Sequence, residues 1–282
     1  MSVRIVTDSA CDLPQALADE LGIIIVPLSI RFGAEEFIDR KDLSVSDFWR
    51  RSQASPVLPE TAAPSPGSFE VAYRTLLAAG ATSVVVISLS GDLSATKQSA
   101  ELAARSVADD IAVSVVDSRS VTIGQGMIAV AAARLAATGA SSEEVIALAT
   151  SLAGRTQVWA ALDTLDNLKK SGRIGNAKAL LASVLSIKPI IEVRNGKVEE
   201  GGKQRTRSKA IAFLVEKVRS EIAAHGSIEN LAVCHAAVSD VDSIVNQLKA
   251  IYPHPIVVGD IGPVIGSHSG TGAVGVVFQV PA

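Results

Sequence analysis

The chain has 282 residues, which is enough for one large domain or two ordinary ones. Hydrophobic residues make up 48% of it and aromatic residues only 4%, which favours an aliphatic α/β core and argues against the stacking platforms of single-stranded nucleic-acid binders. The net charge of −3 gives no sign of a polyanionic partner, so we expect no nucleic-acid binding.

Neither the cysteines nor the apolar segments indicate secretion or membrane insertion. Cys11 and Cys234 are far apart and match no metal-binding spacing, which favours a reducing compartment. The first residues, MSVRIVTDSA, lack the long apolar core of a signal peptide. The longest apolar-rich run, residues 124–140, contains Arg134 and is too short to cross a bilayer. We therefore expect a cytoplasmic protein with at most transient membrane contact.

Apolar strands alternate with alanine-rich helices in the first half of the chain. The segment VRIVTDSACDLP predicts a strand, a polar loop and then a helix from Pro14. Further strands are expected at 23–30, 83–88 and 111–118, and helices at 93–105 and 122–137. This pattern predicts a mostly parallel sheet covered on both faces, an α/β/α sandwich. Ligands of such folds bind beyond the carboxyl ends of the strands, which points to the loops at Asp8, Ser88–Ser94 and Asp117–Ser120.

The second half of the chain has a different pattern. A helix with a glycine turn is expected over 162–175, followed by a strand over 186–193 and a hairpin turn at Asn195-Gly196. The later elements are expected to be helices at 208–224 and 241–250 and strands at 230–236, 256–260 and 273–278. A hairpin with helices predicts an α+β domain with an antiparallel component. We place the boundary after the polar turn AGRT, which gives domains 1–155 and 156–282.

The segment LPETAAPSPGSFE combines a helix start with a rigid loop. Ser65 and Pro66 fit an N-cap hydroxyl and a first helical turn. Thr61 lies before this cap, in a loop that two prolines stiffen, so its hydroxyl would lose little entropy on being fixed. A functional hydroxyl and an ordinary solvated threonine are both consistent with this context.

The segment SLSGDLSATKQSA places Ser94 between a predicted strand and a helix, where free backbone N–H groups can meet an anion. Ser94 and Lys97 also form the S-x-x-K pattern of penicillin-binding enzymes, and Lys170-Ser171-Gly172 weakly resembles their K-T-G. The chain has no S-D-N motif, and Lys170 lies at the end of a predicted helix, so acyl-enzyme chemistry is the weaker interpretation. No Walker loop surrounds Lys97 either.

His268 and Arg173 are the remaining candidates. His268 lies in IGPVIGSHSGTGAVG among small, polar and flexible residues, so we expect an imidazole that donates to an anion or orients a water. The other histidines are scattered, which predicts no metal site. Arg173 follows a glycine turn at a predicted helix end, where a cation also suits the helix dipole.

Seven segments, in order along almost the full chain, resemble the DegV family, the fatty-acid-binding subunits of bacterial fatty acid kinase. They are TDSACDLP, VPLSIRFG, PSPGSFE, LSATKQSA, LDTLDNLKKSGRIG, SIKPIIEVRNGK and IGPVIGSHSGTGAVG. The resemblance implies a two-domain α/β protein with a long-chain fatty acid buried between its domains. It also implies a non-catalytic, cofactor-free subunit that presents the carboxylate to a separate fatty acid kinase catalytic subunit, which forms acyl phosphate for phospholipid synthesis.

The resemblance assigns a role to each of the four candidate residues. Thr61, in the T-x-x-P-S-P-G loop, and Ser94, in the L-S-x-T-x-Q-S-A segment, match the residues that hold the carboxylate. His268 matches a histidine that joins through a water network, and Arg173 matches an arginine of the surface that engages the kinase. Hydroxyl donors add no charge, so we expect the carboxylate oxygens to stay nucleophilic toward a phosphoryl donor, which an arginine clamp would hinder.

Two departures from the family pattern and two alternatives remain. Ala62 stands where the family commonly has Ser or Thr, which removes one potential hydroxyl, and Ala95 stands where it usually has Gly, which narrows the backbone approach there. The first alternative is a stand-alone acyl hydrolase or transferase that uses Ser94 and His268. The second is a lipid sensor or transport module without a kinase partner.

Overall fold

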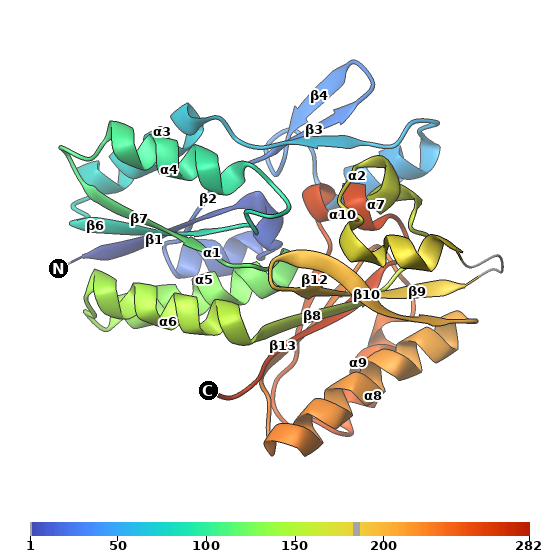
Figure 1. Ribbon diagram of the computed structural model, residues 1–282. Helices are drawn as coiled ribbons and strands as arrows, with labels where there is room; N and C mark the ends of the chain where they lie inside the picture. The colour runs from blue at the N-terminus through green and yellow to red at the C-terminus, as the bar shows by residue number, and fades with distance from the viewer. Residues whose placement is uncertain (1, 183–186) are drawn as a thin grey trace.

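The computed structural model describes residues 2–182 and 187–282, whose strands form three sheets (Figure 1). The first sheet has four parallel strands in the order β2 (Ile24–Val26), β1 (Val3–Asp8), β6 (Ser83–Ser88) and β7 (Ala112–Asp117). Strand β6 is buried at every position except its first, as expected for a parallel sheet that is covered on both faces.

Helices cover the two faces of the parallel sheet (Figure 1). Helices α3 (Pro66–Ala78) and α4 (Thr96–Ser106) lie on one face, and α5 (Thr122–Ala137) and α6 (Ser142–Arg155) lie on the other. Because side chains alternate along a strand, Val6 packs in the core below α3, whereas Ile5 packs in the core with α5. The short elements η1 (Ser9–Cys11) and α1 (Gln15–Glu20) follow β1.

A small antiparallel sheet carries the segment before α3. Its strand order is β4 (Glu35–Ile38), β3 (Ser29–Phe32) and β5 (Glu60–Ala62), and α2 (Val45–Ala54) follows β4 in the chain. The prediction of one strand over 23–30 is wrong, because the chain breaks at Pro27 and its two parts join different sheets. Proline lacks the N–H that would continue the ladder.

The second half of the chain forms a six-stranded sheet in the order β10-β9-β8-β13-β11-β12. Its strands are β8 (Thr156–Ala161), β9 (Lys188–Arg194), β10 (Lys197–Gln204), β11 (Glu229–His235), β12 (Val257–Asp260) and β13 (Val274–Gln279). Among the described strand pairs of this six-stranded sheet, only β11–β12 is parallel, and the others are antiparallel. Helices α8 (Arg207–His225) and α9 (Val241–Lys249) bury their apolar faces against this sheet.

Three short helices complete the fold on the side of the small sheet. They are α7 (Asp166–Lys170), η2 (Gly175–Ala182) and α10 (Pro263–Ser269). Helix α10 packs against α7 and α2 and also against β3, β5 and η1, so it joins the two halves of the chain. Figure 1 shows α2, α7 and α10 gathered beside β3.

The predicted fold class, a parallel sandwich followed by an α+β part with antiparallel strands, is confirmed. The predicted turn at Asn195-Gly196 has φ of 53° and 82°, as a two-residue hairpin requires. Helix α6 ends at Arg155 and β8 begins at Thr156, where the chain passes from one large sheet to the other; the division into domains 1–155 and 156–282 stays a prediction.

Two predicted helices are shorter in the structure. The helix expected over 162–175 is helical only over Asp166–Lys170, and the one expected from residue 93 begins at Thr96, which leaves Ser94 in the preceding loop. Residue 186, the first of the strand expected over 186–193, lies outside the described residues. No helix within 2–182 and 187–282 has both the length and the apolar character needed to cross a bilayer.

Candidate functional site

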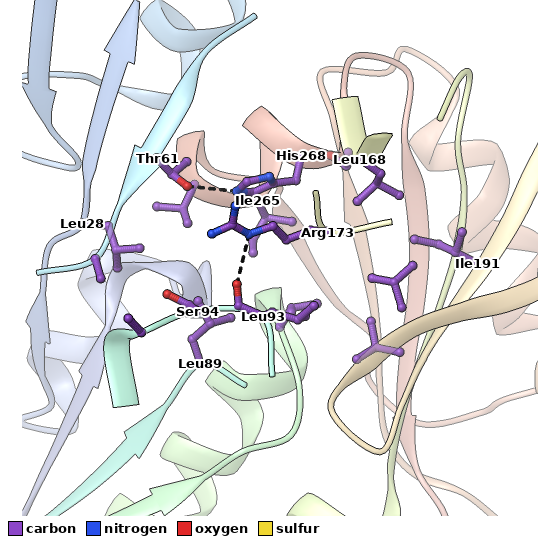
Figure 2. Close-up of a pocket in the computed structure, with 17 residues that line it drawn as sticks. Leu28, Thr61, Leu89, Leu93, Ser94, Leu168, Arg173, Ile191, Ile265 and His268 are labelled. Carbon is purple, nitrogen blue, oxygen red and sulfur yellow. Dashed lines mark hydrogen bonds between the residues drawn. The ribbon is translucent and has the colours of Figure 1, made fainter. Parts of the chain in front are cut away.

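A mostly apolar cavity lies between the carboxyl ends of the parallel strands and the second half of the chain (Figure 2). Together with the solvent-open space at its entrance it comprises about 840 Å³. Its apolar lining comes from both halves and includes Leu28, Leu89, Val121, Leu168, Ile191 and Val264. The sheet edge predicted to bind a ligand therefore does border a cavity.

All four candidate residues line this cavity. Thr61, Ser94, Arg173 and His268 come from β5, the loop before α4, the turn after α7 and helix α10, respectively. Figure 2 shows the arginine side chain between Thr61 and His268 on one side and Ser94 and Leu93 on the other. The structure thus brings together residues that are up to 207 positions apart in the chain.

Thr61 is placed by strand pairing. It lies opposite Ile30 in the β3–β5 ladder, so the expectation of a proline-stiffened loop is wrong at this residue. Its Oγ1 is 3.0 Å from Nε2 of His268. The neighbouring Ala62 is exposed and does not line the cavity, because successive side chains of a strand point to opposite faces. A Ser or Thr hydroxyl at position 62, which this chain lacks, would therefore face away from the cavity that Thr61 lines.

His268 lies in the last turn of α10, which replaces the flexible surroundings expected from the sequence. Pro263 begins this helix and Gly270, with φ of 74°, ends it. The amide of Asn167 in α7 donates to the carbonyl of Ser267 at 3.0 Å and fixes the end of α10. His268 is therefore held by well-packed helical structure.

Burial, assisted by the charge of Arg173, lowers the pKa of His268 to about 4, so the imidazole is neutral at pH 7. Its Nδ1 is buried and has no hydrogen-bond partner among the described residues. The cavity end therefore contains a neutral imidazole that is hydrogen-bonded to Thr61.

Ser94 is held by Thr96, a residue that the sequence reasoning missed. The two hydroxyl oxygens are 2.9 Å apart, and the backbone N–H of Thr96 donates to Ser94 Oγ at 3.3 Å. Thr96 is fully buried at the first position of α4. The S-x-T spacing at a helix start was the available signal, because such hydroxyls bond to nearby backbone groups. Ala95, between the two, lines the cavity.

Arg173 closes the polar end of the cavity. Its Nε donates to the carbonyl of Leu93 at 3.2 Å, and its Nη1 donates to the carbonyl of Ser171 at 2.6 Å. The side chain is exposed and also lines two open grooves outside the cavity. A guanidinium therefore shares the cavity with both hydroxyls, and the expected effect of hydroxyl donors on the carboxylate oxygens stays a prediction.

Buried carboxylates support the loops around the site. Asp8 accepts hydrogen bonds from the N–H groups of Leu89 (2.8 Å) and Ala10 (3.2 Å), and burial raises its pKa to about 6. Asp12 accepts from Thr122 Oγ1 at 2.7 Å and from the N–H of Gly262, directly before α10, at 3.0 Å. Burial raises the pKa of Asp12 to about 7. The predicted functional loop at Asp8 thus holds the strand ends together.

The geometry does not assemble the nucleophile and base of a serine hydrolase. Among the described residues, Ser94 pairs with Thr96 and His268 pairs with Thr61, so no hydrogen bond links Ser94 to the imidazole. Lys97, the lysine of the S-x-x-K pattern, forms an ion pair with Glu101 at 2.9 Å. A general base has to reach the nucleophile's proton, and this arrangement provides no such contact.

Comparisons with known proteins agree with this architecture. The family model described as "Uncharacterised protein, DegV family" matches residues 2–280. A DegV domain-containing protein of Deinococcus radiodurans is 37% identical over 282 residues, which cover 99% of each chain. Among solved structures, a fatty-acid-binding DegV family protein from Thermus thermophilus has a TM-score of 0.92 at 31% identity, with both chains fully covered. DegV of Bacillus subtilis, a fatty acid binding protein, has a TM-score of 0.90 at 30% identity, again over the whole of both chains. The chain belongs to the DegV family.

Proposed function

We propose that this protein binds a long-chain fatty acid in the cavity, with the carboxylate at Thr61 and Ser94. The observation that carries the proposal is the composition of the cavity: its walls are aliphatic, and its polar side chains gather at one end. A fatty acid has the same division into a long apolar chain and one polar group. The related proteins of T. thermophilus and B. subtilis, which are described as fatty acid binding, support this ligand class.

Burial of the acyl chain would supply the favourable free energy of binding. Burial of about fourteen methylene groups gains roughly 11 kcal/mol before association costs. Those costs amount to about 4–15 kcal/mol, so the carboxylate must not add an unpaired charge to them. The hydroxyls of Thr61 and Ser94 supply donors, and the exposed guanidinium of Arg173 supplies a positive charge at the same end.

The protein's role would be to present the carboxylate to a separate fatty acid kinase, which forms acyl phosphate for phospholipid synthesis. The polar end of the cavity supports this role, because Arg173 there also borders two open grooves where a partner could reach the carboxylate. The described residues at the cavity end supply hydrogen-bond donors but no paired nucleophile and base, which favours a binding subunit over an enzyme.

Native mass spectrometry of the purified protein tests the ligand. We expect a co-purifying fatty acid, and saturable oleate binding once it has been extracted. Ser94→Ala should weaken oleate binding roughly tenfold, whereas Thr75→Val, which removes an exposed hydroxyl on α3 outside the cavity, should leave it unchanged. No bound lipid and no saturable oleate binding would overturn the proposal.

A reconstitution with a fatty acid kinase tests presentation. Phosphate should pass from ATP to bound oleate only when both proteins are present. Oleate binding without any acyl phosphate in this mixture would favour a lipid sensor or transport module. Hydrolysis of an acyl ester by the pure protein, lost in Ser94→Ala, would instead favour the enzyme.

A further inference from the structure

We propose that Thr96 is a positioning residue, which turns the hydroxyl of Ser94 into a hydrogen-bond donor toward the cavity, as His268 does for Thr61. The inference rests on the proposed fatty-acid function and concerns how the cavity end selects its ligand. It starts from the capacity of a hydroxyl group, which has one hydrogen to donate and two lone pairs to accept.

The contacts of Thr96 fix the direction of its hydrogen bond with Ser94. Thr96 is fully buried, and in the described structure its hydroxyl meets only the Ser94 hydroxyl, at 2.9 Å. If Ser94 were the donor, the hydroxyl hydrogen of Thr96 would be buried without an acceptor, which is costly. Thr96 therefore donates. Its backbone N–H also donates to Ser94 Oγ, at 3.3 Å, so both lone pairs of Ser94 are used and its hydrogen is free for the ligand.

The second hydroxyl is arranged in the same way by another group. A carboxylate can only accept, so Thr61 must donate to it, and the oxygen of Thr61 must then accept from Nε2–H of His268 at 3.0 Å. This tautomer leaves a lone pair on the buried Nδ1, which has no partner among the described residues. An unpaired buried acceptor is more common in proteins than an unpaired buried N–H. The neutral state of His268 is consistent with this assignment.

The hydroxyls of Thr61 and Ser94 are therefore both held as donors toward the cavity, and neither is free to accept from the ligand. An ionised carboxylate satisfies both donors. A fatty amide with the same acyl chain has an NH₂ group in place of one oxygen. This NH₂ group would face a hydroxyl that is fixed as a donor and cannot accept its hydrogen. We expect the protein to bind oleate much more tightly than oleamide, and we expect this preference to depend on Thr96.

The test compares oleate and oleamide on delipidated protein by titration calorimetry. Thr96→Val removes the hydroxyl and keeps the backbone N–H, so Ser94 gains an unused lone pair. Oleate should bind roughly fivefold to tenfold more weakly, and oleamide should change less than about twofold, so the preference for the acid narrows. Thr96→Ser, which restores a hydroxyl, should recover the wild-type preference. In a Ser94→Ala background, Thr96→Val should have little further effect on oleate.

Equal losses for the two ligands, or an equal loss of oleate affinity in the Ser94→Ala background, would overturn the inference. A second measurement uses the wild-type protein and does not depend on any variant folding. Nitrogen-15 chemical shifts of oleate-bound protein should show His268 protonated at Nε2, and a proton at Nδ1 would contradict the assignment for Thr61. Wild-type protein that binds neither ligand would instead reject the proposed function itself.

Discussion

The packing of α10 against α2 predicts that Gly266→Ala damages both stability and binding. A Cβ at Gly266 would lie 2.7 Å from a ring carbon of Phe48 and 2.8 and 2.9 Å from ring carbons of Trp49, whereas ordinary van der Waals contacts are 3.4–4 Å. Both rings are buried, and Trp49 Nε1 is held by the carbonyl of Ile261 at 3.2 Å, so neither ring can yield easily. The helix must move instead, and His268 moves with it.

The magnitude follows from two opposing effects. Overpacking a rigid core costs about 1–3 kcal/mol, and replacing glycine with alanine in a helix returns up to about 1 kcal/mol. We expect a net loss of about 1–2 kcal/mol in the free energy of unfolding, or a Tm lowered by roughly 2–8 °C. Oleate affinity should also fall, because displacement of His268 withdraws its hydrogen bond from Thr61.

Urea unfolding and oleate titration measure these two effects. The control is Gly154→Ala in α6, where an added Cβ meets no atom within 4 Å. That variant should be as stable as the wild type, or more stable by up to about 1 kcal/mol. A Gly266→Ala protein that matches the control in stability and the wild type in oleate affinity would refute the reasoning.

Three further predictions concern charge and protonation. Arg173→Gln should weaken oleate binding roughly threefold to tenfold but leave methyl oleate binding unchanged in a titration, and equal losses would argue against a role for the charge. Burial raises the pKa of Asp12 from the ordinary value of 3.8 to about 7 in the folded protein. Between these two values the folded protein keeps a proton on Asp12 that the unfolded chain has lost, so the free energy of unfolding falls as pH rises through this range. Urea unfolding at about pH 5 and about pH 8 should show a smaller pH effect in Asp12→Asn, and equal slopes would contradict the assignment. The pKa of His268 is lowered from 6.5 to about 4, so its contribution is present above this range and is lost as pH falls through it. In the same assay His268→Gln should flatten the loss of stability over that acid range, and an unchanged profile would refute the shift.

Most of the parallel sandwich could be predicted, because its strands are continuous apolar runs. Strand β6 and helix α5 have the bounds that the sequence indicates, 83–88 and 122–137. The stretch 23–30 misled the prediction because it looks like one apolar run, and only tertiary pairing shows that it serves two sheets. Strand β5 has three residues, too few for any periodicity, and its pairing with β3 depends on residues about thirty positions earlier.

The candidate residues were easier to identify than their contacts. Motif order in the family indicated Thr61, Ser94, Arg173 and His268, and the structure places all four at one cavity. The direct bond between Thr61 and His268 could not be read from the sequence, because it depends on the packing of α10 beside β5. The contact of Thr96 with Ser94 was not predicted, because a threonine at a helix start usually bonds only to nearby backbone groups.

The 207-residue separation between Thr61 and His268 has a consequence for the protein during its synthesis. At about 5–20 residues per second, a ribosome needs roughly 10–40 s to add His268 after Thr61. During that interval the nascent chain gains the aliphatic cavity walls of its first half, but it still lacks helix α10, which carries His268 at the polar end of the cavity. Under the proposed function, capture of a fatty acid would therefore be a late event, and a bound lipid would mark a chain whose synthesis has passed α10.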